Sequence, residues 1–149
     1  MDCAPVGDIR LEHKRNLKVI AQFPLTALAT LAALVVYFLS GVLVVLARSK
    51  YHVRAPAIVG DPAFERAFRA QQNVLEWMPL FLPALWLFAI ALSDTWAAVL
   101  GILWSLARLG YIFAYGAAAE KREPYFMAQL AAFAALWIGA LIGTLRVLF

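Results

Sequence analysis

Charged side chains are scarce in this chain and absent from long stretches of it. Asp, Glu, Lys and Arg make up 15% of the 149 residues, whereas hydrophobic residues make up 64%. A soluble domain is usually about a quarter charged. No charge occurs at positions 19–47, 77–93 or 124–145, and each stretch suits a membrane-spanning helix of roughly 20 residues. This composition leaves no room for a separate soluble domain and predicts an integral membrane protein.

Cysteine and histidine are also scarce, and this removes two common kinds of site. Cys3 is the only cysteine, so neither an intrachain disulfide nor a cysteine-based metal site is expected. His13 and His52 lack the spacing of metal ligands, and we expect no metal. Basic residues exceed acidic ones, 13 against 9, but they gather at segment ends, and the sequence contains no nucleic-acid-binding motif. A nucleic acid is therefore not an expected partner.

Four membrane-spanning helices are predicted, at about 23–47, 62–92, 95–118 and 124–149. They follow a polar segment at 1–22, so the expected fold is an all-α, four-helix membrane bundle at 23–149. The loops after the first and third helices share one side of the membrane, which holds eight basic residues against five on the other. The excess of positive charge predicts that both loops lie in the cytoplasm. A bacterial inner membrane and an endoplasmic reticulum membrane both fit this pattern.

Three polar side chains lie on a single face of the second predicted helix. Arg69, Asn73 and Glu76 are spaced by four and three residues, so they point the same way. A cation, an amide and an anion at the edge of a bilayer are costly unless they face a partner, water or a ligand. This stripe therefore predicts half of a binding site.

A second polar stripe runs along the third predicted helix and continues just past its end. Its members are spaced by three, four and seven residues and are Arg108, Tyr111, Tyr115 and Arg122. Arg48 ends the first helix on the same side of the membrane, so we expect all these groups at one depth. Guanidinium groups bind carboxylates through paired hydrogen bonds, and a carboxylate binds an ammonium group. The pattern predicts a ligand with more than one carboxylate and one amine, a description that glutathione fits.

Other interpretations of the same residues need no ligand. Arg108 and Glu76 suit a structural ion pair, because a buried arginine needs a partner in any case. Arg48 suits a headgroup anchor. Glu76 and Arg108 as membrane charges also suit a small four-helix transporter, although their position near one interface and away from the midplane argues against it.

Two long stretches resemble a known family. FERAFRAQQNVLEWMPLFLPALW at 64–86 and LGILWSLARLGYIFAYGAAAEKR at 100–122 are similar to the membrane-associated proteins in eicosanoid and glutathione metabolism (MAPEG). The nearest branch holds leukotriene C synthase and the microsomal glutathione transferases. The resemblance covers roughly residues 25–149 and implies a homotrimer that binds glutathione between neighbouring subunits. It implies a membrane glutathione transferase that conjugates lipophilic electrophiles from the bilayer or reduces lipid hydroperoxides.

The resemblance also implies residue roles on the first two helices. Arg69 and Asn73 match positions that hold the γ-glutamyl carboxylate of glutathione, and Glu76 matches the position that takes its amine. Arg48 and Gln71 match contacts to the glycine end. These residues are therefore expected to be glutathione-binding.

On the third helix the implied roles divide between binding and catalysis. Arg108, Tyr111 and Tyr115 match the third-helix wall of the glutathione pocket. Arg122 matches the arginine that stabilises the thiolate and is the expected catalytic residue. The non-catalytic lipid-binding branch lacks that arginine. A lipid-binding scaffold of the same fold is nevertheless the alternative function.

Three departures from the family pattern affect the expected activity. Ser49 stands where leukotriene C synthase has a second arginine proposed to act on the lipid epoxide, which argues against leukotriene synthesis. Trp77 replaces an expected tyrosine and removes one possible ligand hydrogen bond. Gln71 stands where the prostaglandin E synthase branch has histidine, which argues against that isomerase activity.

Overall fold

The computed structural model describes residues 21–149 and contains four long helices within them. The elements, in chain order, are α2 (Pro24–Lys50), α3 (Pro62–Ala91), α4 (Asp94–Ala117), the 3-10 helix η1 (Ala119–Arg122) and α5 (Glu123–Leu148). All four long helices have the length and composition to cross a membrane. The prediction of an all-α membrane bundle is confirmed, while most of the predicted polar segment at 1–22 lies outside the described residues.

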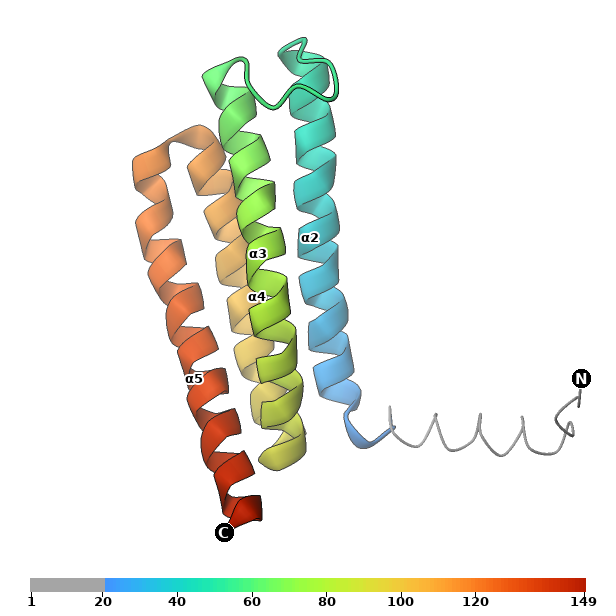
Figure 1. The fold of residues 1–149 in the computed structure, drawn as a ribbon, viewed down its shortest axis with the longest axis vertical. Coiled ribbons are helices and arrows are strands. Elements are labelled where there is room, and N and C mark those ends of the chain that lie inside the picture. The colour runs from blue at the N-terminus through green and yellow to red at the C-terminus, as the bar shows by residue number, and fades with distance from the viewer. Residues whose placement is uncertain (1–20) are drawn as a thin grey trace, which may run out of the picture.

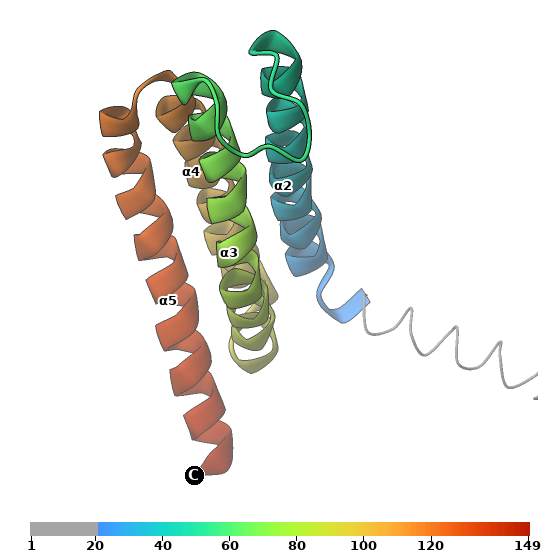
Figure 2. The ribbon, with the colours of Figure 1, turned by 45° about the horizontal axis from the view of Figure 1, so that its top comes forward.

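The helices run antiparallel to their neighbours in chain order (Figure 1). α3 and α4 occupy the middle of the bundle, and each of them packs against all three of the other long helices. α2 and α5 lie at opposite edges, and a view turned by 45° shows the same order (Figure 2). The α2–α3 loop and η1 lie at one end of the bundle, and the α3–α4 turn and the C-terminus lie at the other. Residues from several helices therefore meet near the loop end, as the sequence predicted.

The first membrane helix ends later than predicted. The sequence placed its end near residue 47, but α2 continues to Lys50. Arg48 and Lys50 lie in its last turn, where positive charge is favoured by the helix dipole. Interfacial cations therefore extend this helix by one turn and do not terminate it.

α3 begins at Pro62, as predicted, and its own sequence fixes this start. Asp61 is the N-cap residue, and its Oδ1 accepts a hydrogen bond from the Ala63 N–H at 2.7 Å. Pro62 occupies the first helical position, where a missing N–H costs nothing. Glu65 Oε1 accepts a second hydrogen bond from the Gly60 N–H at 3.0 Å. These contacts set where the polar face of α3 begins.

The core joins α2, α3 and α4 through close packing. The ring of Phe81 stacks on that of Trp104, with centroids 3.9 Å apart. A Cβ atom at Gly101 would lie 2.9 Å from Leu85 Cδ1 and 3.1 Å from Ala29 Cβ, so glycine permits this approach of three helices. Small residues at such crossings are typical of membrane bundles, in which van der Waals packing drives association.

One side chain connects two helices at the end opposite the loops. Asp94, the first residue of α4, accepts hydrogen bonds from the backbone N–H groups of Thr26 at 2.8 Å and Leu25 at 3.1 Å. These two groups belong to the first turn of α2, where N–H groups have no partner inside the helix. Asp94 therefore caps α2 from the neighbouring helix, while Ser93 caps α4 itself.

Candidate functional site

A pocket of about 440 Å³ opens at the loop end of the bundle; we call it the main pocket. It is formed by the α2–α3 loop, α3, α4 and η1. Six of the nine residues predicted for the site line it, namely Arg69, Asn73, Glu76, Tyr111, Tyr115 and Arg122. Members of both polar stripes predicted from the sequence therefore meet in one place.

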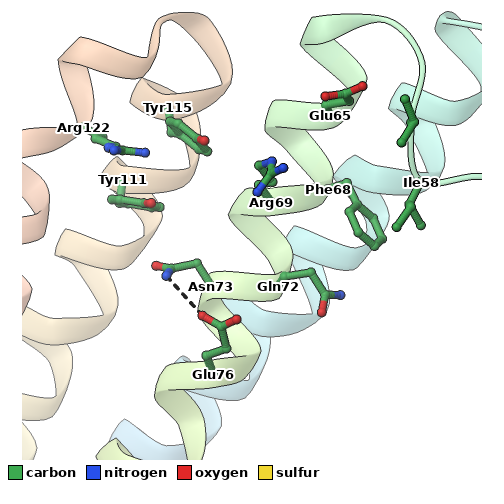
Figure 3. Close-up of a pocket in the computed structure, with 11 residues that line it drawn as sticks. Ile58, Glu65, Phe68, Arg69, Gln72, Asn73, Glu76, Tyr111, Tyr115 and Arg122 are labelled. Carbon is green, nitrogen blue, oxygen red and sulfur yellow. Dashed lines mark hydrogen bonds between the residues drawn. The ribbon is translucent and has the colours of Figure 1, made fainter.

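The α3 wall carries Arg69, Asn73 and Glu76, which we call the α3 stripe. Figure 3 shows the three side chains one above another along the helix. The Asn73 amide nitrogen donates to Glu76 Oε2 at 3.5 Å, which is near the limit for a hydrogen bond. Arg69 and Glu76 are exposed, so the stripe offers a cation, an amide and an anion to a ligand.

The opposite wall is built by α4 and η1. Tyr111, Tyr115 and Arg122 point toward α3 (Figure 3). η1 brings Arg122 back over α4, so that its Cζ atom lies 4.8 Å from the centre of the Tyr115 ring. A cation held over an aromatic face is favourably placed. The exposed guanidinium of Arg122 therefore faces the α3 stripe across the main pocket.

Two smaller cavities adjoin Arg122. One has a volume of about 240 Å³ and is lined by Asn73, Tyr111, Arg122 and Phe126. The other has a volume of about 320 Å³ and lies between η1 and the start of α5, where Arg122 and Phe126 again contribute. Arg122 thus borders the polar main pocket and also cavities that share an aromatic wall.

Arg108 does not line the main pocket, although the sequence placed it there. Its side chain is fully buried, and its Nη1 atom donates to Asn73 Oδ1 at 2.7 Å. Asn73 therefore lies between Arg108 and the main pocket. The hydrogen-bonded partner is Asn73 and not Glu76, the partner considered from the sequence.

Arg48 and Gln71 also lie outside the main pocket of their own chain. Arg48 Nη1 donates to the carbonyl oxygen of Ala57 at 2.7 Å, and its Cζ atom lies 4.9 Å from the centre of the Phe64 ring. Gln71 Oε1 accepts a hydrogen bond from Gln72 Nε2 at 2.8 Å. In this structure Arg48 therefore holds the α2–α3 loop.

Five residues of the main pocket were not predicted. They are Ile58, Val59, Glu65, Phe68 and Gln72. The helical period could have found Gln72, because it lies three residues after Arg69 and four before Glu76. No local pattern marks Ile58 and Val59, since the path of a loop across a pocket depends on tertiary contacts.

The main pocket is suited to an organic ligand that carries both signs of charge. Arg69 and Arg122 supply two guanidinium groups for carboxylates or a thiolate, and Glu76 supplies one anion for an amine. Its volume lies within the range of small-molecule sites, roughly 300–1,000 Å³. Within residues 21–149, no three His, Cys, Asp or Glu side chains come together as metal ligands would.

Comparisons with known proteins identify the family of the chain. The MAPEG family model matches residues 26–142. An uncharacterised protein of Synechocystis sp. is 45% identical over 121 residues, which cover 81% of this chain and 85% of that protein. Microsomal glutathione S-transferase 2 of Bos taurus is 39% identical over 100 residues, covering 67% and 68%. Leukotriene C4 synthase of Rattus norvegicus is 37% identical over 115 residues, covering 76% and 74%. The predicted family is confirmed, and the chain belongs to the MAPEG family.

Proposed function

We propose that this integral membrane protein is a glutathione transferase that activates glutathione as the thiolate and transfers it to lipophilic electrophiles from the bilayer. The observation that carries the proposal is the position of Arg122, which faces the α3 stripe across one pocket. A relative named microsomal glutathione S-transferase 2, similar over two thirds of the chain, supports glutathione as the ligand.

The α3 stripe would orient the γ-glutamyl end of glutathione. Glu76 is exposed toward the pocket and would take the amine. Arg69, one turn before Asn73, would hold the carboxylate together with the Asn73 amide. This order would direct the cysteinyl sulfur across the pocket, toward the tyrosines and Arg122. The tyrosine hydroxyls would then contact the peptide.

Arg122 would act on the sulfur. A free thiol has a pKa of about 8.5, and an adjacent guanidinium favours the thiolate, which is the nucleophile. Each unit by which the thiol pKa falls corresponds to about 1.4 kcal/mol of preference for the charged form. At pH 7 a fall of about two units would therefore convert most of the bound thiol into thiolate.

Two reactions follow from such a thiolate. In conjugation, sulfur forms a bond to an electrophilic carbon, and the leaving group departs with its electron pair. In peroxide reduction, the thiolate attacks the terminal oxygen of a lipid hydroperoxide and releases the alcohol. The first step leaves the glutathione sulfur as a sulfenic acid. A second glutathione then displaces its hydroxyl as water, giving glutathione disulfide. The cavities beside Phe126 are where the apolar part of either substrate would meet Arg122.

We further propose a homotrimer in which Arg48 and Gln71 contact glutathione in the main pocket of a neighbouring subunit. Both residues lie outside the main pocket of their own chain. Arg48 has five N–H donors and uses one of them on Ala57. The remaining donors can serve a carboxylate at the glycine end of the ligand. The loop end of the bundle would face the cytoplasm.

Thiolate absorbance tests the proposal directly. We would mix the purified, detergent-solubilised protein with glutathione at neutral pH and record the ultraviolet absorbance of the thiolate for wild type and Arg122→Ala. Lys121→Ala is the matched control, because Lys121 is an exposed cation on the same turn that lines none of the three pockets around Arg122. We expect a rise for wild type and for the control and none for Arg122→Ala.

The same variant separates activation from binding. Arg122→Ala should keep its glutathione affinity within about tenfold of wild type, or roughly 1.4 kcal/mol, and should lose most turnover with an activated aryl halide. An unchanged thiolate signal in Arg122→Ala would contradict the role of this residue. Absence of glutathione binding in wild type would favour the lipid-binding scaffold.

A further inference from the structure

Arg108 is a cation buried completely among aromatic rings. Its Cζ atom lies 5.1 Å from the centre of the Tyr111 ring, 5.3 Å from Trp104 and 5.7 Å from Trp77. Aromatic faces stabilise a cation, but they accept no strong hydrogen bond. Among the described residues, its Nε and Nη2 atoms have no hydrogen-bond partner. The bond from Nη1 to Asn73 is therefore the strong directional contact of this buried group.

This bond determines which way the Asn73 amide faces. Asparagine carries an acceptor and a donor of nearly equal shape, and either can point outward. Arginine has only donors, so Asn73 must turn its Oδ1 atom inward to Arg108. Its Nδ2 atom then faces the main pocket and Glu76, as Figure 3 shows. With Arg108 in place, Asn73 therefore presents its donor to a ligand in the main pocket.

Trp77 contributes to the same arrangement. It stands where the family pattern has tyrosine, and its ring is held edge-on by Phe126 and Phe133, with centroids 6.3 Å and 5.3 Å away. The same ring also lies beside the guanidinium of Arg108. Tryptophan is the best aromatic partner for a cation, so this contact is consistent with tryptophan in place of tyrosine. This departure thus serves the residue behind the pocket.

We propose that Arg108 is a positioning residue that makes the main pocket selective for a carboxylate opposite Asn73. It acts through Asn73 and does not touch the ligand. The proposal rests on the proposed function, because the carboxylate in question is that of the γ-glutamyl group of glutathione. Without Arg108 only the long contact to Glu76 Oε2, at 3.5 Å, holds the Asn73 amide, which can then turn to present its oxygen and repel a carboxylate.

Two ligands and three variants test this role. We would titrate glutathione and an analogue that lacks the γ-glutamyl α-carboxylate, 4-aminobutanoyl-cysteinyl-glycine. Arg108→Gln removes the donor-only property and should weaken glutathione binding by at least about tenfold, with less than about twofold change for the analogue. Arg108→Lys keeps a donor-only cation, so its glutathione affinity should stay within about threefold of wild type.

Asn73→Asp separates the pocket contact from the stability of the fold. An aspartate keeps Arg108 paired but has no donor for the ligand, so it should lose glutathione affinity as Arg108→Gln does and bind the analogue normally. Asn73→Asp with wild-type glutathione affinity would overturn the proposal, as would equal loss of both ligands in Arg108→Gln. A wild-type protein that binds neither ligand would overturn the proposed function as well, which distinguishes the two failures.

Discussion

Glu76 supplies the negative charge of the α3 stripe, and its carboxylate is exposed toward the main pocket. Hydrogen bonds to charged groups contribute about 1.5–3 kcal/mol, so Glu76→Gln should weaken glutathione binding by roughly tenfold to a hundredfold. Glutathione acetylated on its amine should bind wild type and Glu76→Gln equally. Isothermal titration of both ligands in detergent measures this difference.

The matched control for this variant is Glu120→Gln. Glu120 is an exposed carboxylate on η1 that does not line the main pocket, so its removal changes the net charge by the same amount. We expect its glutathione affinity to equal that of wild type. Equal weakening in both variants would show a general charge effect and no contact between Glu76 and the amine.

The helical spacing of the polar residues predicted which side chains share one face of a helix. It did not predict which of them reach the main pocket. The periods of four and three placed Arg69, Asn73 and Glu76 on one face, and they do share one wall of the main pocket. Arg108 has the same kind of spacing with Tyr111 but packs behind Asn73. A helical period fixes the direction of a side chain, whereas the neighbouring helix decides whether it reaches a cavity or the core.

At the scale of the helices, the cap on α2 supplied by Asp94 joins two elements that are distant in sequence. Replacing a capping side chain by alanine costs about 1 kcal/mol. Asp94→Ala removes both acceptors for the Leu25 and Thr26 N–H groups and should lower the unfolding temperature in detergent. Asp94→Asn keeps one acceptor oxygen and should lower it less. The exposed neighbour Thr95 provides the control, and a Thr95→Ala shift as large as that of Asp94→Ala would contradict the cap.

Hydropathy found the four long helices because each must offer an apolar surface to the lipid over a fixed thickness. It placed α3 and α4 within a residue or so at each end, since caps such as Asp61 are local. It ended α2 too early and did not show the Asp94 cap on α2. The path of Ile58 and Val59 along the main pocket was equally hidden, because both features depend on contacts across the bundle.

At the scale of the whole molecule, one chain holds most of the proposed glutathione site but not all of the predicted contacts. The main pocket contains the α3 stripe, both tyrosines and Arg122. Arg48 and Gln71 lie elsewhere on the same chain. If neighbouring subunits share the ligand, each subunit gives its pocket to one ligand and these two side chains to another. A closed ring of identical chains satisfies every such site once.

This arrangement predicts that two inactive variants restore each other. Arg48→Ala/Gln71→Ala keeps an intact pocket but lacks the side chains offered to the neighbour, while Arg122→Ala has the opposite defect. When the two chains are co-expressed in equal amounts, about a quarter of the sites should join an intact pocket to an intact neighbour, because each condition holds for half of the subunits. Turnover of glutathione with an activated aryl halide should therefore reach about a quarter of the wild-type value.

Mixing the two variants after separate purification is the control, because assembled trimers do not exchange subunits on the assay timescale if the interface is stable. Co-expressed chains no more active than that mixture would show that each site is contained in one chain.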